Sequence, residues 1–124
     1  MPGVKGRARQ CRTLLTALLL SALLVLASGP GFHTRADLDR HYRKHGAEFG
    51  HISESQYLHL AQQLRDAPAG RDILQSVKPY GVITRFDRRH GYFGAYNSDG
   101  TIRTFFIPVD GERYFHRQAH RTND

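Results

Sequence analysis

The chain has 124 residues and a formal net charge of +7, with 18 lysines and arginines against 11 aspartates and glutamates. This length allows one small domain and excludes a multidomain protein. It contains a single cysteine, Cys11, and so cannot form an internal disulfide. The fold therefore has to depend on a hydrophobic core.

Residues 1–27 have the pattern of a secretory signal peptide. The first 12 residues carry four basic side chains and no acidic one, and residues 14–27 are uncharged and rich in leucine. A basic start followed by an apolar run of about 7–15 residues is typical of such signals. We expect cleavage after Ala27 and a secreted or periplasmic protein without stable membrane association. The alternative is an uncleaved anchor, although a spanning helix needs roughly 20 apolar residues.

Cleavage would leave a mature chain that begins near Ser28 and is less basic than the whole sequence. It would retain 14 basic and 11 acidic residues, a net charge of +3, together with all eight histidines. A modestly basic, histidine-rich domain suits an anionic partner such as nucleic acid, although many other domains share this composition.

A first helix is expected after a flexible lead at residues 28–36. The segment "ADLDRHYRKH" begins at Ala36 and is followed by Gly46. Glycine often occupies the left-handed position after a helix, so we expect Gly46 to end this one. Leu38 and Tyr42 then lie on one face of the helix, together with His41 and His45.

The second helix has a clear start and a clear end. Ser53 followed by Gln56 forms a capping-box pattern, and the segment "DAPAG" at 66–70 breaks the helix. Between them, apolar residues recur at the spacing of one helix face: Tyr57, Leu60, Ala61 and Leu64.

Four short runs rich in β-branched and aromatic residues follow, and we expect each to be a strand. The turn sequences "PYG", "RRHG" and "SDG" separate them, and connections this short require antiparallel neighbours. Pro108 is expected to end the last strand. The predicted fold class is therefore α+β, with two N-terminal helices packed on a four-stranded antiparallel meander. The predicted strands are 73–78, 82–87, 92–97 and 101–108.

His41 and His45 are four residues apart on the first helix, so both rings can reach one point. Three interpretations are open. Zinc binding would need a third ligand, and Arg43 and Lys44 between the rings would repel a cation. The pair could instead lie on a solvated helix face, or it could catalyse proton transfer, because histidine titrates near neutral pH.

The segment "IRTFF" at 102–106 offers a partner for these histidines. Strand alternation predicts that Ile102, Thr104 and Phe106 share one face, with Arg103 and Phe105 on the other. Thr104 could bind a phosphate and Phe106 could stack on a base. Alternatively, these residues are ordinary components of the core.

Several segments resemble a phage- and toxin-associated family in the superfamily that groups barnase, EndoU, colicin D and RelE-like ribonucleases. They are "HYRKHGAEFGHISESQYLHLA" at 41–61, "FDRRHGYFGAYNSDGTIRTFFIP" at 86–108 and "YF" at 114–115. The resemblance covers residues 40–115. It implies a small metal-independent ribonuclease with helices packed on an antiparallel four-stranded sheet, whose products end in a 2′,3′-cyclic phosphate.

The resemblance also implies roles for particular residues. Lys44 and His45 match the lysine–histidine pair of the family, and His41 matches an earlier histidine. His45 would be the main acid–base group, Lys44 would stabilise phosphoryl charge, and His41 would be a second proton carrier or a support. Thr104 would complete the catalytic set by orienting the phosphate. The expected substrate-binding residues are Phe106, Arg85 and Arg103.

We therefore expect an exported, toxin-like, metal-independent endoribonuclease that needs no cofactor. Its domain would span residues 37–118, with a tail at 119–124. Its substrate would be single-stranded RNA or tRNA, and an acidic immunity or inhibitor protein is an expected partner. The alternative from another class is a non-catalytic exported binding domain of the same fold.

Overall fold

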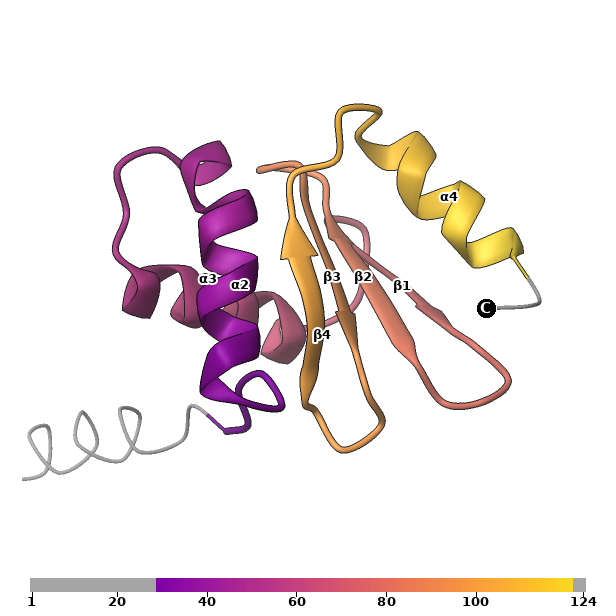
Figure 1. The fold of residues 1–124 in the computed structure, drawn as a ribbon. Coiled ribbons are helices and arrows are strands. Elements are labelled where there is room, and N and C mark those ends of the chain that lie inside the picture. The colour runs from indigo at the N-terminus through magenta and orange to yellow at the C-terminus, as the bar shows by residue number, and fades with distance from the viewer. Residues whose placement is uncertain (1–28, 122–124) are drawn as a thin grey trace, which may run out of the picture.

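A computed structural model describes residues 29–121 (Figure 1). Its four strands form one antiparallel sheet in the order β1-β2-β3-β4, which confirms the predicted α+β meander with N-terminal helices. The predicted signal peptide and its cleavage site lie outside the described residues. In chain order the elements are α2 (Arg35–His45), the 3₁₀ helix η1 (Gly46–Phe49), α3 (Glu54–Asp66), β1 (Ile73–Val77), β2 (Ile83–Asp87), β3 (Tyr92–Tyr96), β4 (Ile102–Phe106) and α4 (Glu112–His120).

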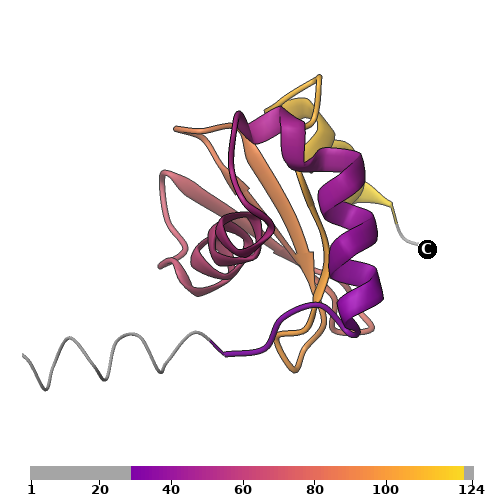
Figure 2. The same cartoon turned by 60° about the vertical axis from the view of Figure 1, so that its left-hand side comes forward.

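The helices lie on both faces and along one edge of the sheet (Figure 1; Figure 2). Helix α3 covers one face, α4 packs on the opposite face, and α2 runs beside the edge strand β4. Within the part of the chain that the structure describes, no helix is long and apolar enough to cross a membrane.

The described part of the expected flexible lead, residues 29–36, is instead packed onto the domain. The Ile102 N–H donates to the carbonyl of Gly31 over 2.9 Å, and Phe32 forms a parallel bridge with the same strand. Thr34 then caps α2, because its hydroxyl accepts a hydrogen bond from the Asp37 N–H over 3.0 Å. The lead therefore brings the start of α2 against β4.

Gly46 lies at the end of α2, but the expected left-handed conformation is wrong, because its φ is −55°. A side chain at this position would collide with the ring of Tyr42, since an added Cβ would lie 2.6 Å from that ring. The Tyr42 hydroxyl donates to the Ile52 carbonyl over 2.5 Å. Gly46 is thus required by close packing, and the chain continues directly into η1.

The predicted capping box of α3 is confirmed, with Ser53 accepting from the Gln56 N–H and the Gln56 side chain accepting from the Ser53 N–H. The helix buries its predicted apolar face against the sheet. The hydroxyl of Tyr57 donates to the carbonyl of Phe105 over 2.5 Å, and burial raises the pKa of Tyr57. This core cluster contains Tyr57, Ala61, Leu64, Tyr96, Ile102 and Phe105.

Helix α4 was not expected from the sequence. It packs Phe115 against Phe86 on the second face of the sheet, with ring centres 6.4 Å apart. The buried Lys78 ammonium donates to the carbonyls of Gln118 and Arg121 at the end of this helix. Residues 119–120, expected to begin a tail, therefore belong to a helix that is fixed to the sheet.

Candidate functional site

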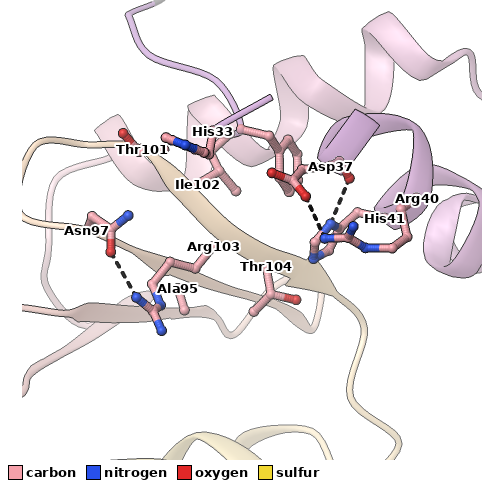
Figure 3. A pocket seen from close by; sticks show the side chains of 11 residues that line it. His33, Asp37, Arg40, His41, Ala95, Asn97, Thr101, Ile102, Arg103 and Thr104 are labelled. Atoms are coloured by element: carbon pink, nitrogen blue, oxygen red, sulfur yellow. Dashed lines mark hydrogen bonds and ion pairs between the residues drawn. The ribbon is translucent and has the colours of Figure 1, made fainter. Parts of the chain in front are cut away.

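A cavity of about 410 Å³ lies between α2 and the β3–β4 hairpin (Figure 3). Helix α2 forms one wall, the end of the lead forms a second, and the sheet forms the floor. The lining residues with polar side chains are His33, Asp37, Arg40, His41, Asn97, Thr101, Arg103 and Thr104.

The floor is hollow because short side chains follow a row of large ones on this face of the sheet. Phe86, Phe93 and Phe106 are aligned across β2, β3 and β4, next to α4. The neighbouring row pairs Ala95 with Thr104. These two small side chains leave the space that the cavity occupies.

A bulge in β4 determines which side chains line this floor. Ala95 pairs with Thr104, but the next residue, Tyr96, pairs with Ile102, so Arg103 is an extra residue in the ladder. Ile102 is consequently buried in the same cluster as Phe105. The prediction that Ile102 shares a face with Thr104 and Phe106 is wrong, because regular alternation does not continue through a bulge.

His41 projects from α2 toward Thr104 (Figure 3). Its Nδ1 lies 2.8 Å from the Asp37 carbonyl, and its ring centre lies 4.8 Å from that of Phe32. A carbonyl can only accept a hydrogen bond, so Nδ1 carries the proton in the neutral ring and Nε2 is the free acceptor. Helix α2 and strand β4 thus meet at the cavity through His41 and Thr104.

His45 lies one turn further along α2, outside the residues that line the cavity. Its ring centre is 6.5 Å from that of His41, and its ring stacks on Phe106 at 5.2 Å. Only 15% of its side chain is exposed. Its Nδ1 lies 2.7 Å from a carboxylate oxygen of Glu48, a residue that sequence reasoning missed. The available signal was its position three residues after His45, a spacing at which helical side chains meet.

The positive charges that line the cavity are the guanidinium groups of Arg40 and Arg103. Arg40 pairs with Asp37 over 2.6 Å, and Arg103 donates to the Asn97 side chain over 3.0 Å. The hydrogen bond with Thr34 and the nearby Arg40 hold the pKa of Asp37 below its usual range. Arg103, which was predicted to bind substrate, thus lines the cavity, and Arg40 is an addition from the structure.

Lys44 is exposed and is not among the residues that line the cavity. The position predicted for a phosphoryl-stabilising lysine therefore lies outside the recess, while Arg40 lines it. The two residues share α2, but the helix turns Arg40 and His41 toward the sheet edge.

Phe106 was expected to stack on a base, but other side chains already surround its ring. His45 stacks on it, and the rings of Phe93 and Tyr114 lie 5.4 and 5.3 Å away. The structure therefore places Phe106 as a support for His45 between α2 and α4.

The remaining predicted arginine, Arg85, is engaged in structural contacts and does not line the cavity. Arg85 donates to the carbonyls of Leu64 and Ala67, at the end of α3, and to the side chain of Gln75. The nearby Arg88 and Arg89 pair with Glu112 and Asp72, respectively. Arg85 thus satisfies carbonyl groups that the end of a helix leaves unpaired.

Replacing Arg85 with methionine is expected to lower the free energy of unfolding by about 1–3 kcal/mol, because hydrogen bonds from a charged group to the end of α3 are lost. If the protein binds RNA, the predicted substrate, its affinity should stay unchanged, since Arg85 does not line the cavity. Chemical denaturation and an RNA-binding titration of the same variant measure the two effects. A loss of RNA affinity without a loss of stability would restore Arg85 as a substrate-binding residue.

Comparison with known proteins assigns neither a family nor a function to this chain. No protein-family model matches this chain, and no curated protein matches it. Among residues 29–121, no group of three or more histidine, cysteine, aspartate or glutamate side chains is arranged to hold a metal ion. The cavity geometry therefore carries the functional conclusion.

Proposed function

We propose that the protein is an exported, metal-independent endoribonuclease related to the barnase, EndoU, colicin D and RelE-like group. One observation carries the proposal: His41 and Thr104 line a single cavity together with Arg40 and Arg103. The resemblance of residues 40–115 to that group supports the same conclusion.

In the proposed reaction the 2′-oxygen of RNA forms a bond to phosphorus while the bond to the 5′-oxygen breaks. One proton leaves the 2′-hydroxyl and one proton is added to the departing 5′-oxygen, so the products are a 2′,3′-cyclic phosphate and a 5′-hydroxyl. Two side chains that exchange protons near neutral pH can carry out both transfers. Fixed positive charge stabilises the negative charge that develops on the phosphoryl oxygens.

The histidine pair provides the two proton carriers. The ring centres of His41 and His45 are 6.5 Å apart, and in each ring Nδ1 is held by an oxygen acceptor, which leaves Nε2 for substrate. The acid and base roles are assigned to the pair and not to either ring. His41 lines the cavity, and His45 supplies the second imidazole beside it.

The other groups in the cavity bind the phosphate. Arg40 and Arg103 supply cationic donors, and the Thr104 hydroxyl projects into the recess between them (Figure 3). Unpaired nucleotides can turn a phosphate into such a recess, so the substrate we propose is single-stranded RNA or an exposed loop of tRNA. An acidic inhibitor protein that covers these arginines is the partner that the proposal implies.

The second candidate is a non-catalytic RNA-binding domain of the same fold. The burial of His45 favours it, because only 15% of that side chain is exposed, and so does the position of Lys44 outside the cavity. In this case the arginines would bind phosphate without proton transfer.

Purified protein that lacks the predicted signal peptide, residues 1–27, is expected to cleave unstructured RNA in the presence of excess EDTA. The products should carry 2′,3′-cyclic phosphate ends, and an oligonucleotide with a 2′-O-methyl group at every position should stay intact because it lacks the nucleophile. Gel analysis and mass spectrometry of the products measure both. RNA binding without cleavage would support the binding domain, and cleavage that EDTA abolishes would refute metal independence.

A further inference from the structure

We propose that Glu48 is the positioning residue of His45: it holds the imidazole as the Nδ1–H tautomer and so makes Nε2 the atom that accepts a proton. This inference rests on the proposed function for its catalytic meaning. The tautomer itself is a property of the folded protein and can be measured whether or not RNA is cleaved.

The two carboxylate oxygens of Glu48 have separate partners. Oε2 lies 2.7 Å from Nδ1 of His45, and Oε1 accepts a hydrogen bond from the Ile107 N–H over 2.9 Å. An ionised carboxylate only accepts hydrogen bonds, so His45 must donate from Nδ1. A carboxylate that accepts a hydrogen bond from one ring nitrogen fixes both the tautomer and the orientation of the imidazole.

The surrounding chain explains why Glu48 can act in this way. Gly46 lets the backbone pass directly from α2 into η1, which brings Glu48 back toward the helix end. Ile107 immediately follows Phe106, the residue on which the His45 ring stacks. The carboxylate therefore links the end of the helix to the end of β4, and the imidazole is held between the carboxylate and the aromatic ring.

The chain contains a similar pair that offers a matched control. Glu112 lies 3.2 Å from Nε2 of His116 on α4, and it also pairs with Arg88. Both members of this pair are more than one-third exposed, and neither lines the cavity beside α2. Glu112→Gln makes the same chemical change as Glu48→Gln at a site away from the two histidines.

The Glu48→Gln variant tests the inference. The glutamine side-chain oxygen can still accept a hydrogen bond from the Ile107 N–H. The NH₂ group of the same side chain then faces Nδ1 of His45, and this group can only donate. We expect the His45 ring to change from the Nδ1–H to the Nε2–H tautomer while the fold is retained. The ring ¹⁵N chemical shifts of His45, recorded above its titration midpoint in each protein, report this change directly. In RNA cleavage, kcat should fall by about 10–100-fold with little change in KM.

The results of these measurements either support or overturn the role of Glu48. An Nδ1–H tautomer in both proteins would overturn it, and so would a changed tautomer with an unchanged kcat in an active enzyme. Glu112→Gln should leave the His45 shifts and kcat at their wild-type values, and a loss of activity there would also overturn the assignment. If the wild-type protein cleaves no RNA, the proposed function fails, and the tautomer change alone then decides whether Glu48 positions His45.

Discussion

The His41→Ala variant is expected to cleave RNA about 10²–10⁴-fold more slowly than the wild-type protein, which is the usual contribution of a positioned acid or base. His41 lines the cavity with Thr104, and its Nε2 is free to exchange a proton with substrate. The ring also contacts Phe32, so circular dichroism should confirm that the lead and α2 stay folded. Single-turnover cleavage of an unstructured oligonucleotide measures the rate of the chemical step.

His59→Ala is the matched control for this variant. His59 is an exposed histidine on α3, where it lines a different recess, and its removal should leave the rate unchanged. If His41 and His45 act together in one reaction, the double variant should be far less impaired than the product of the two single losses predicts. A His41→Ala protein that retains wild-type activity would remove His41 from the mechanism.

The second large effect concerns stability. Phe105→Ala is expected to lower the free energy of unfolding by about 3–5 kcal/mol, a large share of the roughly 5–15 kcal/mol available to a domain. Phe105 is 0% exposed, and the rings of Phe49, Tyr57 and Tyr92 surround it. Its removal would leave a cavity where α3, η1 and β4 meet. Urea denaturation followed by circular dichroism measures the loss.

Two further variants keep this prediction testable if Phe105→Ala does not fold. Phe105→Leu retains most of the buried volume and should cost less than the alanine change. Val109→Ala lies at a fully exposed position after β4 and should be neutral. Equal losses for Phe105→Leu and Val109→Ala would show that the core does not depend on Phe105.

Most elements of the fold could be predicted because their signals are local. The capping box of Ser53 and Gln56 acts within four residues, and the turn glycines Gly81, Gly91 and Gly100 all adopt the positive φ that glycine favours. Short turns between apolar runs leave only antiparallel pairing. The meander was therefore accessible from the sequence, with strand ends correct to within one or two residues.

Most of the misjudged features depend on contacts between separate elements, and Gly46 depends on a side chain one helical turn earlier. Gly46 is dictated by the ring of Tyr42 and not by its own φ, and the bulge at Arg103 is set by pairing with β3. Helix α4 carries many charged residues, and its position depends on Phe115 and on the bonds that Lys78 makes to its last carbonyls. Alternation and helix periodicity describe one segment at a time and contain none of these contacts.

The same distinction applies to the candidate site. Residue spacing alone predicts that His41 and His45 share a helix face and that Thr104 lies within a strand, because helical and strand periodicity are properties of the backbone. Only the packing of the folded chain brings His41 and Thr104 to one cavity and places Arg40 rather than Lys44 beside it. These relations arise when α2 packs beside β4, and such packing depends on the complementary shapes of segments that are far apart in the chain.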